Sequence, residues 1–172
     1  MKSNVIWRTG KKHLTQNNNL TLFFNNLYPY KANKKSIKKN FVVVGIGGNV
    51  GDTKKIFLKL FKMLQADSRF FINSTSPLLQ NPPFGFLEQK DFLNGIIVLQ
   101  TDLSPSALLL EMQRYEKRFK RVRSFKDAPR TLDIDIIFFN QLKLKSEKLI
   151  IPHPNYQERE SVMIPLEFVL SV

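Results

Sequence analysis

The chain has 172 residues, of which 42% are hydrophobic, and it contains seven glycines and no cysteine. This length and composition fit one globular domain and exclude a wholly disordered, collagen-like or disulfide-stapled protein. Because the chain has no cysteine and only two histidines, iron–sulfur clusters, thiolate zinc sites and histidine-rich metal centres are excluded as well.

The net charge of +13 is concentrated near the N-terminus. Residues 1–40 carry nine basic and no acidic side chains, whereas residues 41–172 carry 18 basic and 14 acidic ones. We therefore divide the chain into a basic N-terminal extension, 1–40, and a domain, 41–172. A basic extension can bind nucleic acid or a membrane surface. We favour a solvated extension that is partly ordered or docked on the domain through its apolar patch, Leu20 to Tyr30.

No targeting or membrane segment is evident in the sequence. No apolar run approaches the roughly 20 residues that a membrane helix needs, and the N-terminus lacks the apolar core of a signal peptide. We expect a cytosolic protein without membrane contact.

The spacing of apolar residues predicts the first elements of the domain. Residues 41–47 form a compact apolar run typical of a buried strand. Apolar residues then recur at helical spacing over 53–66, with Asp52 or Thr53 as the N-cap. Residues 69–75 predict a second strand.

The remaining elements complete a βαββαβ order. They are a loop over 80–91, a strand over 92–101, a helix from Ser104-Pro105 to near Lys120, a basic loop over 120–130, and a strand over 131–139. This order is that of a ferredoxin-like α+β sandwich, here with long loops. Many unrelated functions use this fold, so function has to be argued from the site.

Asp133 and Asp135 are the clearest indication of a functional site in the sequence. Residues i and i+2 of a strand point to the same face, so the two Cβ atoms lie roughly 7 Å apart. Two carboxylates on one face repel and are costly to desolvate, and a Mg²⁺ ion relieves both costs. The alternative is a half-exposed strand whose aspartates pair with nearby arginines.

A basic segment leads into this strand. Its cations are Arg118, Lys120, Arg121, Arg123, Lys126 and Arg130. Arginine binds phosphate oxygens in pairs, so the segment could hold a polyphosphate, although it could also be a solvated helix end. The run GIGGNVG matches neither GxGxxG nor a Walker P-loop, and we interpret it as a tight turn. His153 lies between two prolines, where a structural hydrogen bond is the commoner role.

Together these motifs resemble the 6-hydroxymethyl-7,8-dihydropterin pyrophosphokinase family from about Val42 to Leu166. The matching motifs are GGNVGD, FLNGIIVLQT, MQRYE, RVR, PRTLDIDII and IPHP. The resemblance implies transfer of an intact diphosphate from ATP to the hydroxymethyl group of the dihydropterin, with release of AMP. It also implies two Mg²⁺ ions and a ferredoxin-like domain with three mobile loops.

The same resemblance implies roles for individual residues. Asp133 and Asp135 match the metal-binding aspartates. Arg121 and Arg130 match arginines that assist transfer. Positions that match the nucleotide site are Gln113, Glu116, Arg123, Ile136, His153 and Arg159. Positions that match the pterin site are Pro82, Phe84, Phe92, which stacks on the ring, and Asn94, which recognises its edge; the turn Gly47-Gly48-Asn49 matches a segment lining the site.

Two positions depart from the family pattern. Asp127 and Ser161 stand where the family commonly has aromatic residues, and Ser161 leaves one wall of the pterin slot in doubt. We expect a monomer that binds ATP and the pterin, and no nucleic acid. The alternatives are a basic ferredoxin-like RNA-binding module, which lacks the aromatic strand motif of that class, and a diverged binder without turnover.

Overall fold

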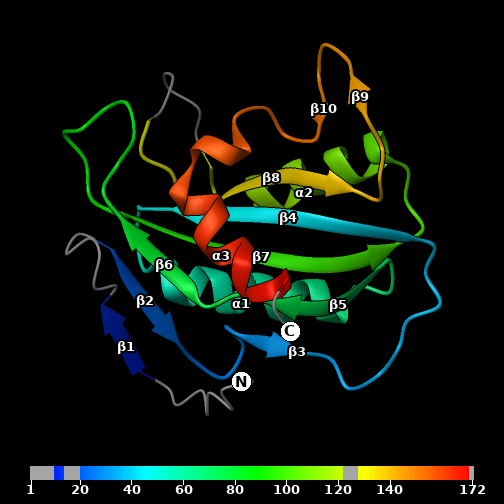
Figure 1. The fold of residues 1–172 in the computed structure, drawn as a ribbon, viewed down its shortest axis with the longest axis horizontal. Coiled ribbons are helices and arrows are strands. Elements are labelled where there is room, and N and C mark those ends of the chain that lie inside the picture. The colour runs from blue at the N-terminus through cyan, green and yellow to red at the C-terminus, as the bar shows by residue number, and fades with distance from the viewer. Residues whose placement is uncertain (1–9, 14–19, 122–127, 171–172) are drawn as a thin grey trace.

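The computed structural model describes residues 10–13, 20–121 and 128–170, which form a large antiparallel sheet with helices on both faces. Figure 1 shows α3 (Glu160–Leu170) crossing one face of the sheet, with α1 (Thr53–Ala66) and α2 (Pro105–Arg118) on the opposite face. This α+β arrangement confirms the predicted fold class.

The centre of the sheet carries the site. β4 (Asn40–Gly48) lies between β7 (Phe92–Thr101) and β8 (Asp133–Phe139). Gly47 of β4 is opposite Asn94 on one side and opposite Asp133 on the other. The strand register therefore brings residues 47, 94 and 133 into one row, although they are far apart in the sequence.

Both long helices begin where the sequence predicts. The side chain of Asp52 accepts a hydrogen bond from the Lys55 backbone N–H at 3.1 Å and caps α1. Ser104 caps α2 in the same way through the Ala107 N–H at 3.3 Å. The core between these helices and the sheet contains, among others, Val42, Val44, Ile46, Phe57, Leu60, Leu108, Met112, Leu132, Ile134 and Ile136.

β5 (Phe70–Thr75) is the expected second strand. Several other elements lie outside the sequence prediction: β6 (Leu78–Asn81), β9 (Leu144–Lys145), β10 (Ile150–Ile151), the 3₁₀ turn η1 (Tyr156–Glu158) and α3. The prediction of a loop from residue 80 is wrong at Gln80 and Asn81. These two residues pair with Leu93 and Phe92 of β7, and the breakers Pro82-Pro83 come only after them.

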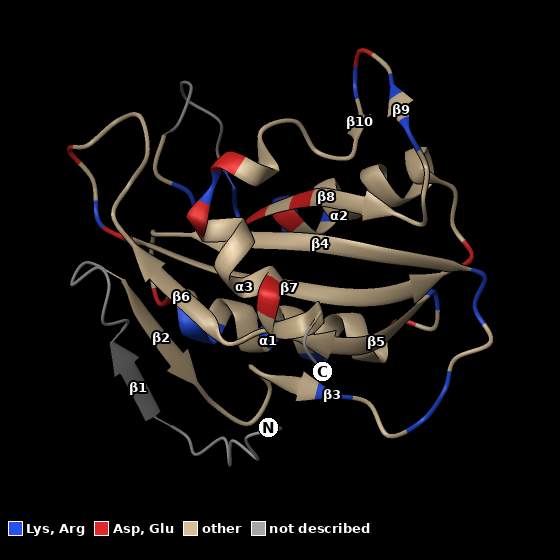
Figure 2. Cartoon of the chain, viewed as in Figure 1, with Lys and Arg blue, Asp and Glu red and all other residues tan. Residues whose placement is uncertain are grey.

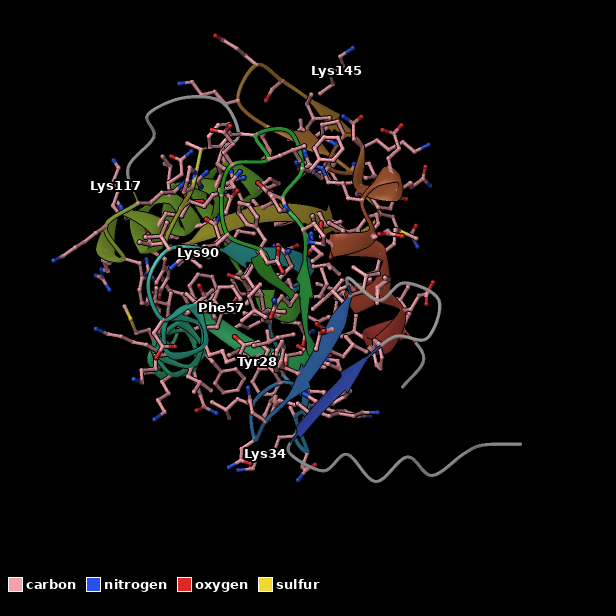
Figure 3. All side chains as sticks on the ribbon, turned by 90° about the vertical axis from the view of Figure 1, so that its left-hand side faces the viewer. Tyr28, Lys34, Phe57, Lys90, Lys117 and Lys145 are labelled. Atoms are coloured by element: carbon pink, nitrogen blue, oxygen red, sulfur yellow. The ribbon has the colours of Figure 1, made fainter. Side chains whose placement is uncertain are left out.

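The N-terminal residues add further strands to this sheet. β1 (Gly10–His13) pairs with β2 (Thr21–Phe24), β2 pairs with β6, and β3 (Tyr30–Lys31) pairs with β5. Tyr28 is fully buried beside Phe57 of α1 (Figure 3), and its hydroxyl donates to the Phe57 carbonyl oxygen at 3.1 Å. Residues 20–31 therefore contribute to the sheet and to the core.

Charge is distributed unevenly over the folded chain. The basic residues between β3 and β4 lie on a long connection at the edge of the molecule (Figure 2), and Lys34, Lys35 and Lys39 are exposed. Within the described residues, no helix has both the length and the apolar character needed to cross a membrane.

Candidate functional site

A cavity of about 540 Å³ opens on the sheet face opposite α1 and α2. It is bounded by β4, β7 and β8, by the loop after β6, and by the first turn of α3. Of the site residues predicted from the sequence, the structure brings these together in its lining: Pro82, Phe84, Phe92, Asn94, Arg130, Asp133, Asp135 and Arg159.

The two aspartates share one face of β8, as the strand period predicts. Ile134 and Ile136 between and after them point into the core on the other face. Asp133 pairs with Arg121 Nη1 at 2.5 Å and with Arg130 Nη1 at 3.1 Å. The carboxylate of Asp135 has no hydrogen bond or ion pair with any described residue, although its backbone pairs with Gly45 of β4. Burial and the neighbouring carboxylate of Asp133 raise the pKa of Asp135.

This donor set fits a magnesium ion. Mg²⁺ in proteins is commonly held by one or two carboxylates, with substrate phosphates and water completing the shell. In the part of the chain that is described, no group of three or more acidic, histidine or cysteine side chains offers a complete protein cage. The structural alternative, aspartates neutralised by arginines, holds for Asp133, whereas no described arginine pairs with Asp135.

A second cavity, of about 250 Å³, lies at the end of α2 beside β8. It is lined by Gln113, Glu116, Lys117 and Arg121. Glu116 is buried, accepts a hydrogen bond from the Ile134 N–H at 2.9 Å, and pairs with Arg121. Because Arg121 Nη1 contacts both Glu116 and Asp133, this guanidinium connects the two cavities.

Phe92 and Asn94 form the part of the large cavity that fits a flat heterocycle. Asn94 Nδ2 donates to Asn81 Oδ1 at 2.7 Å, which fixes the side-chain amide. Gly47 of β4 lies directly beside this amide. A Cβ atom at Gly47 would lie 2.6 Å from Asn94 Oδ1, so a larger residue would displace the amide that Asn81 fixes. The Arg130 guanidinium carbon lies 5.1 Å from the centre of the Phe92 ring.

Asn49 holds three parts of the site together. Its Oδ1 accepts from the Arg130 backbone N–H at 2.9 Å, and its Nδ2 donates to Gln89 Oε1 at 2.8 Å and to the Lys90 carbonyl at 2.9 Å. The family resemblance places this residue in a lining segment without giving it these partners. The glycines before Asn49 are the signal in the sequence, but the predicted tight turn is wrong at Gly45–Gly48, which pair within the sheet as the end of β4. A Cβ at Gly48 would lie 2.6 Å from the Thr131 carbonyl oxygen, so the close approach of this chain requires a glycine.

Some predicted site residues lie elsewhere. The side chain of Ile136 is buried in the core and does not line either cavity. His153 lines neither cavity; its backbone N–H donates to the Ile137 carbonyl at 3.0 Å, and its buried Nδ1 has no partner within the described chain. Arg123 and Asp127 lie outside the described residues. Ser161, the second departure from the family pattern, lines the large cavity.

Comparisons with known proteins show which family this chain resembles. The family model described as 7,8-dihydro-6-hydroxymethylpterin-pyrophosphokinase matches residues 43–171. The 2-amino-4-hydroxy-6-hydroxymethyldihydropteridine pyrophosphokinase of Campylobacter jejuni is 42% identical over 93% of this chain and 97% of its own length. The proteins of the same name from Helicobacter pylori and Bacillus subtilis are 42% and 32% identical, over 81% and 74% of this chain and 86% and 76% of their own lengths. The Campylobacter alignment extends into the first forty residues.

Proposed function

The chain belongs to the 7,8-dihydro-6-hydroxymethylpterin-pyrophosphokinase family, and we propose that it performs the family's reaction with two Mg²⁺ ions held at Asp133 and Asp135. In that reaction a diphosphate passes from ATP to the hydroxymethyl group of 6-hydroxymethyl-7,8-dihydropterin and AMP is released, which is a step of folate biosynthesis. A cytosolic location and a monomeric state are the accompanying predictions from the sequence.

One observation carries the proposal for the site. A single cavity of about 540 Å³ contains a pair of carboxylates, an arginine that contacts one of them, and a fixed amide next to a phenyl ring. The first two features suit a magnesium polyphosphate. The third suits the face and the hydrogen-bonding edge of a pterin.

The role of the basic residues follows from the charge of the transferred group. Mg²⁺ ions bound at the aspartates would offset the phosphate charge that builds up during transfer. Arg121 and Arg130, which already contact Asp133, are placed to neutralise the phosphate oxygens that reach the same carboxylate. Gln113 and Glu116 line the adjoining smaller cavity, which we assign to the nucleotide. The family resemblance adds Arg123, Ile136, His153 and Arg159 as nucleotide positions, and of these Arg159 lines the large cavity.

The pterin is assigned to the part of the large cavity that is lined by Phe92 and Asn94. Phe92 offers an apolar ring face, and Asn94 presents an amide that can both donate and accept at the edge of the heterocycle. Pro82 and the largely exposed Phe84 belong to the loop after β6, which is placed to cover the substrates and exclude water. Exclusion of water matters because ATP hydrolysis competes with transfer.

A diverged binder without turnover is the remaining alternative, and it is motivated by Ser161 in the cavity wall. The test is release of AMP from ATP with Mg²⁺, measured with and without 6-hydroxymethyl-7,8-dihydropterin. We expect AMP release that requires the pterin and is lost in Asp133→Ala. Binding of both substrates without any AMP release would support the binder instead.

A further inference from the structure

The N-terminal segment reaches the same face of the sheet as the cavity. Thr21 of β2 is opposite Gln80 of β6, and Asn81 of β6 is opposite Phe92 of β7. Continuing this antiparallel register by one residue places Leu20 opposite Asn81. Residues directly opposite each other in a sheet share a face, so Leu20, Asn81 and Phe92 form one row across three strands.

Leu20 is part of the cavity wall. It is only 3% exposed, and it lines the cavity of about 540 Å³ together with Phe92, Asn94 and Ser161. Among these, Leu20 is the one that comes from the N-terminal 40 residues. Leu20, just before β2, therefore adds an N-terminal contribution to a cavity wall that otherwise comes from the central strands, the loop after β6 and the start of α3.

Leu20 and strand β2 also support α3. Leu20, Leu22, Phe24 and Leu79 form a buried apolar cluster, against which Ile164 and Phe168 of α3 pack. Figure 1 shows α3 lying across the sheet beside β6, the neighbour of β2. The first turn of α3 carries Ser161, which lines the cavity.

A flat heterocycle has two faces that both have to leave water for tight binding. Phe92 can cover one face, whereas the small polar side chain of Ser161 supplies little apolar surface for the other. We infer that Leu20 supplies an apolar wall of the pterin slot, so that the N-terminal segment takes part in substrate binding. This inference rests on the proposed function, because it treats the cavity as the pterin slot.

The test compares two leucines of one cluster. Leu20 and Leu22 are 3% and 1% exposed and both belong to the apolar cluster under α3, but only Leu20 is in the cavity lining. We expect Leu20→Ala to raise the KM for the pterin about tenfold at saturating ATP, since one or more lost methylenes in a hydrophobic pocket have effects of this size. The KM for ATP and kcat are expected to change less than about twofold, because Leu20 would contact only the pterin and would bind it equally in the ground state and the transition state.

Leu22→Ala is the matched control. It removes the same atoms from the same cluster, so it lowers the melting temperature by a similar amount, but it leaves the KM for the pterin near the wild-type value. If Leu20→Ala does not fold, Leu20→Val gives a smaller rise in the same constant, and Leu20→Met, which keeps the volume, stays close to wild type.

Two results would overturn the inference, and they are distinguishable. Equal rises of the pterin KM in Leu20→Ala and Leu22→Ala would show that Leu20 acts only through the packing of α3. If the wild-type chain releases no AMP in the presence of pterin and ATP, the proposed function itself fails and the inference fails with it.

Discussion

The backbone N–H of Arg130 donates to the side-chain oxygen of Asn49 at 2.9 Å, across 81 residues of sequence. The Asn49 N–H returns a hydrogen bond to the Arg130 carbonyl at 2.9 Å. This reciprocal pair fixes the backbone from which the Arg130 guanidinium reaches Asp133. The side-chain nitrogen of Asn49, Nδ2, also donates to the Lys90 carbonyl oxygen and so fixes the backbone just before Phe92.

Asn49→Ala is therefore expected to damage the reaction more than the fold. It frees the backbone of Arg130 and the end of the loop before β7, and small misplacements of reacting groups lower kcat roughly ten- to hundredfold. The loss of buried hydrogen bonds lowers the free energy of unfolding by about 1–3 kcal/mol. Pterin-dependent AMP release and urea unfolding measure the two effects.

Asn40→Ala is a suitable control for this variant. Asn40 lies at the other end of β4, where its amide also donates and accepts, to the Leu103 carbonyl and from Asn140, far along the strand from the cavity. A comparable loss of stability without a loss of kcat is expected. Equal losses of kcat in both variants would mean that Asn49 acts through stability alone.

Asp135→Asn is expected to remove activity without weakening the fold. The raised pKa of Asp135 shows that burial and the adjacent Asp133 disfavour its charged form, so a neutral amide relieves a cost when no metal is bound. In the absence of Mg²⁺, the variant should unfold at the same urea concentration as wild type or at a higher one. Its Mg²⁺-dependent AMP release should be lost.

Asp133→Asn is the companion variant, and the sign of its stability change is opposite. It gives up the ion pairs with Arg121 and Arg130, so it should unfold at a lower urea concentration while also losing activity. Full Mg²⁺-dependent activity of Asp135→Asn would exclude Asp135 as a ligand of a required metal ion.

Arg121→Lys separates charge from geometry. Glu116 and Asp133 both contact the same nitrogen, Nη1 of Arg121, so a lysine ammonium can still neutralise the two carboxylates and the fold should persist. Lysine cannot offer the planar fork that binds two phosphate oxygens, and we expect kcat to fall more than about tenfold. Steady-state AMP release measures kcat, and circular dichroism confirms folding.

The exposed Arg118, the last residue of α2 and three residues before Arg121, provides the control for this variant because it lines neither cavity. Arg118→Lys should leave kcat unchanged. A wild-type kcat in Arg121→Lys would argue that Arg121 only stabilises Glu116 and Asp133.

The central elements were predictable because their patterns are local. The apolar run of β4, the caps Asp52 and Ser104, and the alternation around Asp133 and Asp135 each depend on residues close in sequence, and the structure has them as expected. Helix α3 was not predicted because it is apolar almost throughout and contains Pro165, so no 3.6-residue period marks it.

The parts of the site that depend on strand register could not be predicted in this way. Asn81 supports Asn94 only because β6 pairs with β7. Leu20 joins the cavity wall only because β2 in turn pairs with β6. Short edge strands carry little signal of their own, since their pairing is decided by partners that lie tens of residues away.

Acid should weaken the fold partly through Asp67. Arg69 Nε and Nη2 donate to its carboxylate at 2.9 and 2.6 Å and the Tyr115 hydroxyl donates at 2.8 Å, which holds the pKa of Asp67 well below its usual range. Since the folded pKa is the lower one, this stability is complete above the unfolded pKa of about 3.9 and is lost as the pH falls below it. Asp67→Asn should therefore cost about 1–2 kcal/mol of unfolding free energy at pH 7, and the difference from wild type should shrink between about pH 4 and pH 2.

Glu147→Gln is the control, because Glu147 lies on the exposed β9–β10 turn. It should change neither the unfolding free energy at pH 7 nor its dependence on pH. Urea unfolding between about pH 4 and pH 2 tests this prediction. If the difference in unfolding free energy between Asp67→Asn and wild type is the same at both pH values, the charged carboxylate does not have this role.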